Sequence, residues 1–187
     1  MKTLNQTFNL SEYIDILQDN DLLSQIHKLY KVIFKKILNN KKIFLAGNGG
    51  SASISNHAVI DFLKNFKTHN DASKKLFFSL SSNNEVITAI ANDYGYENIF
   101  SFQLSRYSNY KDLLILISSS GNSPNIIKAA KYAKKNGLDL FSLVGFDGGK
   151  LKKLSDQHIH IKSDKYGTIE DVHQIIIHSV ISLSQQY

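Results

Sequence analysis

The sequence has no cysteine and no long apolar run, and each absence excludes a class of protein or site. Without cysteine the chain forms no disulfide and offers no thiolate to a metal ion. No apolar run approaches the roughly 20 residues of a membrane span, so we expect no membrane partner. The polar stretch that follows Met1 is unlike a signal peptide, and we therefore expect a cytoplasmic protein.

Arginine is nearly absent as well, since Arg106 is the one arginine in a chain of formal net charge +6. A clustered basic surface favours nucleic acid, because contacts to phosphates release counterions. Here the lysines fall in short groups near the ends of the expected helices and strands. We expect a solvated lysine surface and no nucleic-acid partner, with the charge helping to attract anionic substrates.

Length and composition predict one globular domain, residues 1–187, because 187 residues with 42% hydrophobic content can bury a full core. Over 10–38, apolar residues recur at helical spacing, which predicts one long or broken helix with Asp19 among its possible caps. So wide an apolar face favours contact with another subunit. We divide the domain into an N-terminal helical region, 1–40, and an α/β core, 41–187.

In the core, short apolar runs of strand length alternate with segments of helical spacing. The expected strands are 42–46, 76–80, 113–117, 138–144 and 158–161, and the expected helices are 51–66, 85–91, 97–107, 124–136 and 168–185. Thr168 is the expected cap of the last helix. Such alternation predicts a three-layer α/β fold with a mostly parallel sheet.

Glycine-rich or serine-rich loops follow three of these strands, at Gly47, Ser118 and Gly145. The carboxyl ends of parallel strands are where such sheets bind ligands. The first loop fits the dinucleotide pattern G-x-G-x-x-A, but the next strand does not end in the acidic residue that pattern requires. Because a P-loop motif is also absent, we expect no nucleotide cofactor.

The loop that begins at Ser118 holds four serines and a glycine just before a helix whose first residue is Pro124 and whose N-cap is Ser123. Hydroxyls, backbone amides and the helix dipole can together hold a phosphate. The alternative is an ordinary serine-rich turn. His57 and Asp61, one helical turn apart, offer metal or acid–base groups, or alternatively form a surface ion pair.

Four motifs resemble the phosphoheptose isomerases, which are enzymes with a sugar isomerase (SIS) domain. They are Gly47-Asn-Gly-Gly-Ser51, Ala89-Ile-Ala-Asn-Asp-Tyr-Gly-Tyr96, Ile117-Ser-Ser-Ser-Gly-Asn-Ser-Pro-Asn125, and Val172-His173 with His178. The resemblance implies a five-stranded parallel sheet and a homotetramer built around the N-terminal helices, with active sites at subunit interfaces. It also implies aldose–ketose isomerisation of sedoheptulose 7-phosphate to a glycero-manno-heptose 7-phosphate, through an enediol, for surface polysaccharide synthesis.

The resemblance further implies a zinc ion held by a His and a Glu one turn apart and by a Gln and a His on the last helix. The matching positions here are His57, Asp61, Glu170 and His178. Asp61 is shorter by one methylene than the family's Glu, and Glu170 is anionic where the family has a neutral Gln. Two histidines and two carboxylates are still a ligand set of the kind that binds zinc. Asp171 is a rival fourth ligand, since it lies nearly on the same helix face as His178.

Combining the loops with the resemblance, we expect Asp61 and His178 to act as base and acid, and His173 to be a possible proton relay or support for the metal ligands. Asn83 takes the place of a family Asp that touches substrate. The expected substrate-binding residues are Asn48, Gly49, Ser51, Asn83, Ser118, Ser119, Ser120, Ser123 and Glu170.

Three other functions remain open at this stage: isomerisation of another sugar phosphate, sensing of a phosphosugar without turnover, and a non-catalytic tetramer that bridges replication-initiator proteins. The intact Ser118 loop and His178 favour an enzyme over the bridging tetramer, which lacks that histidine. The departure at Asp61 keeps the sensing function open.

Overall fold

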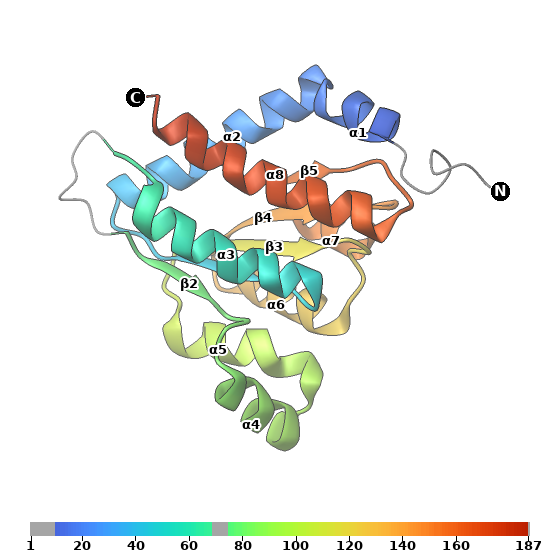
Figure 1. Cartoon of the computed structure of the whole chain (residues 1–187). Coiled ribbons are helices and arrows are strands. Elements are labelled where there is room, and N and C mark those ends of the chain that lie inside the picture. The colour runs from blue at the N-terminus through green and yellow to red at the C-terminus, as the bar shows by residue number, and fades with distance from the viewer. Residues whose placement is uncertain (1–9, 69–74, 187) are drawn as a thin grey trace.

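The computed structural model describes residues 10–68 and 75–186 (Figure 1). Its helices and strands alternate through the core, as the sequence predicts. In chain order they are α1 (Leu10–Leu17), α2 (Asn20–Leu38), β1 (Ile43–Ala46), α3 (Gly50–Asn65), β2 (Phe77–Ser79), α4 (Asn84–Tyr94), the 3₁₀ helix η2 (Tyr96–Asn98), α5 (Ile99–Tyr107), β3 (Leu113–Ser118), α6 (Pro124–Lys135), β4 (Asp139–Val144), α7 (Gly149–Leu154), β5 (Gln157–His160) and α8 (Tyr166–Ser184).

The five strands form one parallel sheet in the order β2-β1-β3-β4-β5, which confirms the predicted fold class. From β1 the chain moves to the β2 edge, and from β3 onward it moves the other way. The strand order therefore reverses between β1 and β3, and a crevice opens outside the carboxyl ends of these two strands. The Gly47 and Ser118 loops leave the sheet at this point.

Two layers of helices cover the sheet (Figure 1). Strand residues alternate between the layers: in β1, Ile43 and Leu45 face the core beneath α2, α3 and α8, whereas Phe44 and Ala46 face the core beneath α4, α5, α6 and α7. All four β1 residues are fully buried. Such continuous burial is typical of a parallel strand that is covered on both faces.

The N-terminal helical region is broken rather than continuous. The Asp19 carboxylate caps α2 by accepting a hydrogen bond of 2.8 Å from the Asp21 backbone N–H. α2 packs against α8, while α1 touches both helices. α1 has no fully buried residue, and its Leu10 and Ile14 side chains are exposed. This region thus leaves apolar surface open, as its wide apolar face predicts.

The N-terminal ends of three helices, α6, α7 and α8, differ from what the sequence predicts. α8 begins at Tyr166, and Thr168 is buried within its first turn instead of capping it. Ser123 does occupy the N-cap of α6, but its hydroxyl makes no capping hydrogen bond. α7 was not predicted, because it is only six residues long and starts from Gly148 at φ 85°, a conformation that periodicity does not reveal.

Across the described ranges 10–68 and 75–186, no helix combines the length and the apolar character that crossing a membrane requires.

His173 is the one imidazole that is fully buried among the described residues, and it lies on the core face of α8. Neither ring nitrogen has a hydrogen-bond partner within the described part of the chain. Burial lowers the pKa of His173 to about 4, and a contact with the Val144 backbone, which falls short of hydrogen-bond geometry, opposes the shift only in part. The ring is therefore neutral in the folded protein at pH 7, and protonation disfavours the folded state.

We predict that His173 makes the protein acid-sensitive. Because the folded pKa lies below the unfolded value of about 6.5, stability falls as the pH drops through that window, by roughly 2 kcal/mol between pH 7 and pH 5. Urea titrations of the wild type and of His173→Leu at both pH values measure the difference. Burial also lowers the pKa of His158, but this residue is present in both proteins, so its contribution to the pH dependence cancels. Equal pH dependence of the two proteins would contradict the prediction.

Candidate functional site

A cavity of about 150 Å³ lies at the crevice between β1 and β3. It is formed by the first residues of α3, the loop after β3 and the first turns of α8. The lining residues are Asn48, Ser51, Ile117, Ser118, Ser119, Ser120, Ser123, Tyr166 and Glu170. Seven of the nine expected substrate-binding residues therefore meet in one cavity.

The serine loop after β3 is held in place by the loop after β4 and by α7. The Gly145 N–H donates to the Ser119 carbonyl at 2.8 Å, and the Leu151 N–H donates to the Gly121 carbonyl at 2.9 Å. Gly121 has φ 61°, and a Cβ on it would lie 2.2 Å from the Gly148 carbonyl oxygen, so only glycine fits. The Ser119 hydroxyl is buried without a hydrogen-bond partner in the described part of the chain. A water molecule or a ligand group bound in the polar cavity would satisfy this hydroxyl.

The turn from β1 into α3 depends on close backbone approach. A Cβ on Gly47 would lie 2.5 Å from the Ser51 backbone, and one on Gly50 would lie 2.3 Å from a Glu170 carboxylate oxygen. Glycine at these positions lets α3 start directly at the end of the strand, next to α8. Gly49, at φ 53°, is the N-cap of α3 and does not line the cavity.

A reciprocal amide pair joins the two loops across the crevice. Asn48 Nδ2 donates to Asn125 Oδ1 at 2.9 Å, and Asn125 Nδ2 donates to Asn48 Oδ1 at 2.8 Å. The Tyr96 hydroxyl also donates to Asn48 Oδ1, at 3.2 Å. Asn125 is buried and was not predicted as a site residue. Its side chain fixes the start of α6 relative to the glycine turn.

The electrostatics of the cavity come from backbone and hydroxyl groups. No lysine or arginine is among its lining residues in the described ranges, while the N-termini of α3 and α6 point toward it. Helix N-termini carry partial positive charge and free N–H groups, which favour a phosphate. The Glu170 carboxylate is the one charged group in the lining, and it favours hydroxyl groups of a ligand over a second anion.

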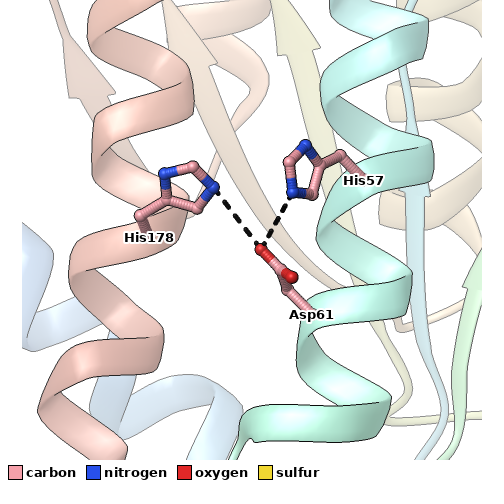
Figure 2. A group of neighbouring side chains, drawn as sticks. All are labelled: His57, Asp61 and His178. Carbon is pink, nitrogen blue, oxygen red and sulfur yellow. Dashed lines mark ion pairs between the residues drawn. The ribbon is translucent and has the colours of Figure 1, made fainter.

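Farther along α3 and α8, His57, Asp61 and His178 come together (Figure 2). Asp61 Oδ2 lies 3.2 Å from His57 Nε2 and 3.5 Å from His178 Nε2. The ring centroids of the two histidines are 5.2 Å apart. Asp61 is largely buried, whereas both histidines are about half exposed, so the cluster opens to solvent on the histidine side.

The donor atoms of this cluster suit a metal ion, since all lie within 4.8 Å of one another. In a tetrahedral site with metal–ligand distances near 2.0–2.1 Å, neighbouring donor atoms are about 3.3 Å apart, as the two Asp61 contacts are. Two imidazoles and one carboxylate leave a position open for another ligand or for substrate.

The expected fourth ligands do not join the cluster. Glu170 lies one helical turn or more nearer the N-terminus of α8, against Gly50 in the serine cavity. Asp171 accepts a hydrogen bond of 2.7 Å from the Tyr13 hydroxyl on α1, which turns its carboxylate away. The sequence placed both residues correctly on the last helix, but their directions depend on which neighbour each meets.

Asn83 is used as the N-cap of α4, where its side chain accepts a hydrogen bond of 3.0 Å from the Val86 N–H. It does not line the cavity. The sequence pattern, a polar residue just before a helical segment, is typical of an N-cap, so Asn83 has a structural role. Tyr166, by contrast, lines the cavity without having been predicted, because it was assigned to the stretch before the last helix.

Comparison with known proteins places this geometry in a family. The model of the SIS domain family matches residues 10–145. The phosphoheptose isomerase of Helicobacter pylori (strain P12) is 41% identical over 147 residues, which are 79% of this chain and 76% of that protein. The phosphoheptose isomerase of Aneurinibacillus thermoaerophilus is 36% identical over 183 residues, which are 98% of this chain and 90% of that protein.

Two solved structures have the same fold over nearly the whole chain. The phosphoheptose isomerase of Neisseria gonorrhoeae superposes with a TM-score of 0.88 at 26% identity, covering 99% of this chain and 100% of that chain. The phosphoheptose isomerase of Francisella tularensis gives the same TM-score and identity, covering both chains completely.

We predict that Asn125→Ala destabilises the protein by about 1–3 kcal/mol, because it leaves the Asn48 amide without its buried partner. The same substitution loosens the serine loop and weakens stabilisation of the fold by a sugar phosphate. Denaturant unfolding and ligand-dependent thermal shifts measure the two effects. Asn136→Ala, at the exposed far end of α6, is the matched control and should change stability by less than about 0.5 kcal/mol.

Proposed function

We propose that this chain, which belongs to the phosphoheptose isomerase family of SIS domain proteins, interconverts sedoheptulose 7-phosphate and a glycero-manno-heptose 7-phosphate for surface polysaccharide synthesis. One observation carries the proposal. The helices α3 and α8 line the serine cavity with their first turns and hold the His57–Asp61–His178 cluster with their middle turns. A phosphate site and a proton-transfer site are thus built on the same pair of helices.

The spacing of the two sites suits a seven-carbon sugar phosphate. Ser51 and His57 are six residues apart on α3, or about 9 Å along the helix axis. An extended chain of bonds advances about 1.2 Å per bond, so the phosphorus and the first carbon of an open heptose 7-phosphate are separated by about 10 Å. A phosphate in the serine cavity would therefore place the carbonyl end near the cluster.

At the phosphate end, we assign binding to Ser118, Ser119, Ser120 and Ser123, with Ser51 and the amides at the α6 N-terminus. The unpaired Ser119 hydroxyl supports this assignment, because a phosphate oxygen supplies the acceptor that the chain does not. Glu170 and Asn48 lie at the same cavity and suit the sugar hydroxyls, which can donate to the carboxylate.

At the reacting end, we assign the base to Asp61 and the acid to His178. Asp61 would take the proton from the carbon next to the carbonyl and return it to the neighbouring carbon of the enediol. His178 would exchange the oxygen-bound proton through Nδ1, because a metal on Nε2 leaves that nitrogen without a proton. Asp61 Oδ2 faces both histidines, whereas Oδ1 has only a long contact of 3.5 Å to Asn65 Nδ2 and stays available.

His57, Asp61 and His178 would hold a zinc ion, which when bound stabilises negative charge on the sugar oxygens. His57 has no other assigned task in the reaction. Its Nε2 is the donor atom that approaches Asp61 most closely, and its half-exposed ring can bind a metal without displacing core residues.

We propose a homotetramer in which another copy covers the apolar surface beside the cluster. A groove of about 350 Å³ lies between α2 and α8, with Leu23 and Ile175 on its walls and His178 at its edge. Leu23 and Ile175 are exposed in the single chain, as are Ile60 and Leu63 on α3. A second copy seated there would bury this surface and close the solvent side of the active site. The cytoplasmic location remains a prediction.

We predict that the purified chain with Zn²⁺ converts sedoheptulose 7-phosphate into an aldose phosphate, and that Asp61→Asn lowers kcat by about 10²–10⁴-fold. The amide keeps the size of the side chain but removes its basicity. Removal of metal with a chelator should lower turnover, and added Zn²⁺ should restore it. Asp171→Asn is the matched control and should keep its activity, because Asp171 contacts Tyr13 instead.

The assay also separates the alternatives. Absence of any aldose phosphate at every zinc concentration would contradict the substrate assignment. Thermal stabilisation by the sugar phosphate without turnover would instead support the sensing function.

We predict that Leu23→Glu with Ile175→Glu converts the tetramer into smaller species, because charged side chains cannot be buried against a partner without compensation. Light scattering after gel filtration measures the mass. Both residues are exposed in the single chain, so the variant should fold. A wild type that elutes as a monomer would contradict the assembly.

A further inference from the structure

We infer that Tyr166 binds the phosphate end of the substrate through its phenol hydroxyl, and that Phe146 positions the Tyr166 ring for this contact. The inference rests on the proposed function, because it concerns the ligand of the same serine cavity. Tyr166 lies in the first turn of α8 and lines that cavity together with the serine loop. Its hydroxyl makes no hydrogen bond to any group of residues 10–68 and 75–186, so it is free to donate to a ligand.

A neutral hydrogen-bond donor matters in this cavity because its described lining holds no cation. Lysine and arginine are missing from that lining, and Glu170 is its one charged group. A phosphate there depends on hydroxyl and backbone donors, and a hydrogen bond to a charged group is stronger than one between neutral groups. Tyr166 lies four residues before Glu170 on the same face of α8, so its phenol adds a donor one turn away from the carboxylate.

The Phe146 ring restricts where the Tyr166 ring can lie. The two ring centroids are 4.7 Å apart and the ring planes meet at 64°, the edge-to-face arrangement that aromatic pairs favour. Tyr166 is 60% exposed, and exposed side chains change rotamer readily. Phe146 is partly buried and packs against the core beneath α2, α3 and α8, so it offers the Tyr166 ring a fixed surface.

The backbone of Phe146 is itself held in an uncommon conformation. Its φ of 47° lies in the left-handed region, which bulky residues rarely adopt. The Phe146 N–H donates to the Ser163 carbonyl at 3.1 Å, and the Phe146 carbonyl lies 2.8 Å from His160 Nε2. Such conformations persist only where the surroundings hold them, and they are concentrated at functional sites.

Lys152 determines the tautomer of His160 that the contact with Phe146 requires. Lys152 Nζ, on α7, lies 3.1 Å from His160 Nδ1. Because an ammonium group can only donate, Nδ1 accepts this hydrogen bond and the ring proton lies on Nε2. His160 Nε2 therefore donates to the Phe146 carbonyl, and residues of α7 and β5 together support the ring that Tyr166 contacts.

The distance of Tyr166 from the reacting end of the substrate determines which kinetic constant it affects. Tyr166 lies twelve residues before His178 on α8, or about 18 Å along the helix axis, so it does not reach the reacting carbons. Its hydroxyl would bind the ground state and the transition state equally. Loss of such uniform binding raises KM and leaves kcat unchanged.

Kinetics of the full chain with Zn²⁺ and sedoheptulose 7-phosphate, together with the apparent Kd from isothermal titration with the same sugar, test the inference. Tyr166→Phe removes only the hydroxyl and should raise KM and Kd by about tenfold or more, with kcat within about twofold of the wild type. Tyr107→Phe, which removes an exposed hydroxyl at the end of α5, is the matched control and should change none of these constants.

Variants of Phe146 test the positioning role. Phe146→Ala should raise KM and Kd by about three- to tenfold, whereas Phe146→Tyr keeps the ring and should stay within about twofold of the wild type. Because Phe146 acts through the Tyr166 hydroxyl, Phe146→Ala combined with Tyr166→Phe should weaken binding no more than Tyr166→Phe does alone. Circular dichroism and thermal unfolding check that each variant folds.

The outcomes separate this inference from the proposed function. Unchanged KM and Kd in Tyr166→Phe would overturn the inference, as would effects of the two substitutions that add in full. Weaker binding in Tyr166→Phe by a wild-type chain that shows no isomerase activity would contradict the proposed function and leave the assignment of Tyr166 standing. A wild type that binds no sugar phosphate would overturn both.

Discussion

The close packing of α3 against α8 is the constraint on which the site depends. At the first turn of α3, Gly50 permits it by leaving room for the Glu170 carboxylate of α8. Both helices leave the carboxyl edge of the sheet and run down the same face (Figure 1). Groups at the same height along the two helices therefore meet: Glu170 lies against Gly50 near the N-termini of the helices, and His178 lies with His57 and Asp61 farther along.

Most of the fold follows from the sequence, because its main determinants are local. Short apolar runs ended by glycine or serine predicted four of the strands, and the alternating stretch around His160 predicted the fifth. Helical spacing predicted the long helices to within a few residues. The break at Asp19 and the start of α6 at Pro124 follow from side-chain capping and from the fixed φ of proline. α7 and the first turn of α8 escaped prediction because positive-φ glycine and tertiary burial, rather than periodicity, determine where they begin.

The residues of the site could be predicted from the sequence, but their arrangement could be predicted only in part. The loops that line the cavity follow strands, and the strand order brings them together, so their residues could be named from the sequence. The directions of the Glu170 and Asp171 side chains could not be predicted in this way. They depend on how α8 is rotated and shifted against α3 and α1, which a single sequence does not specify. The Tyr13 contact of Asp171 and the Gly50 contact of Glu170 are both made across such helix interfaces.

The placement of the acidic residues has a chemical consequence for the reaction. Two carboxylates at the metal would leave it with less positive charge to stabilise an enediolate than a single carboxylate would. With Glu170 in the cavity, the cluster keeps Asp61 as its single carboxylate, and the second negative charge lies where sugar hydroxyls can donate to it. The same placement puts Glu170 in the cavity proposed for the phosphate, so the phosphate would bind on the serine side of that cavity, away from the carboxylate. In the proposed reaction this geometry would orient the substrate with its phosphate toward α6, its hydroxyls along Glu170 and its carbonyl end at Asp61.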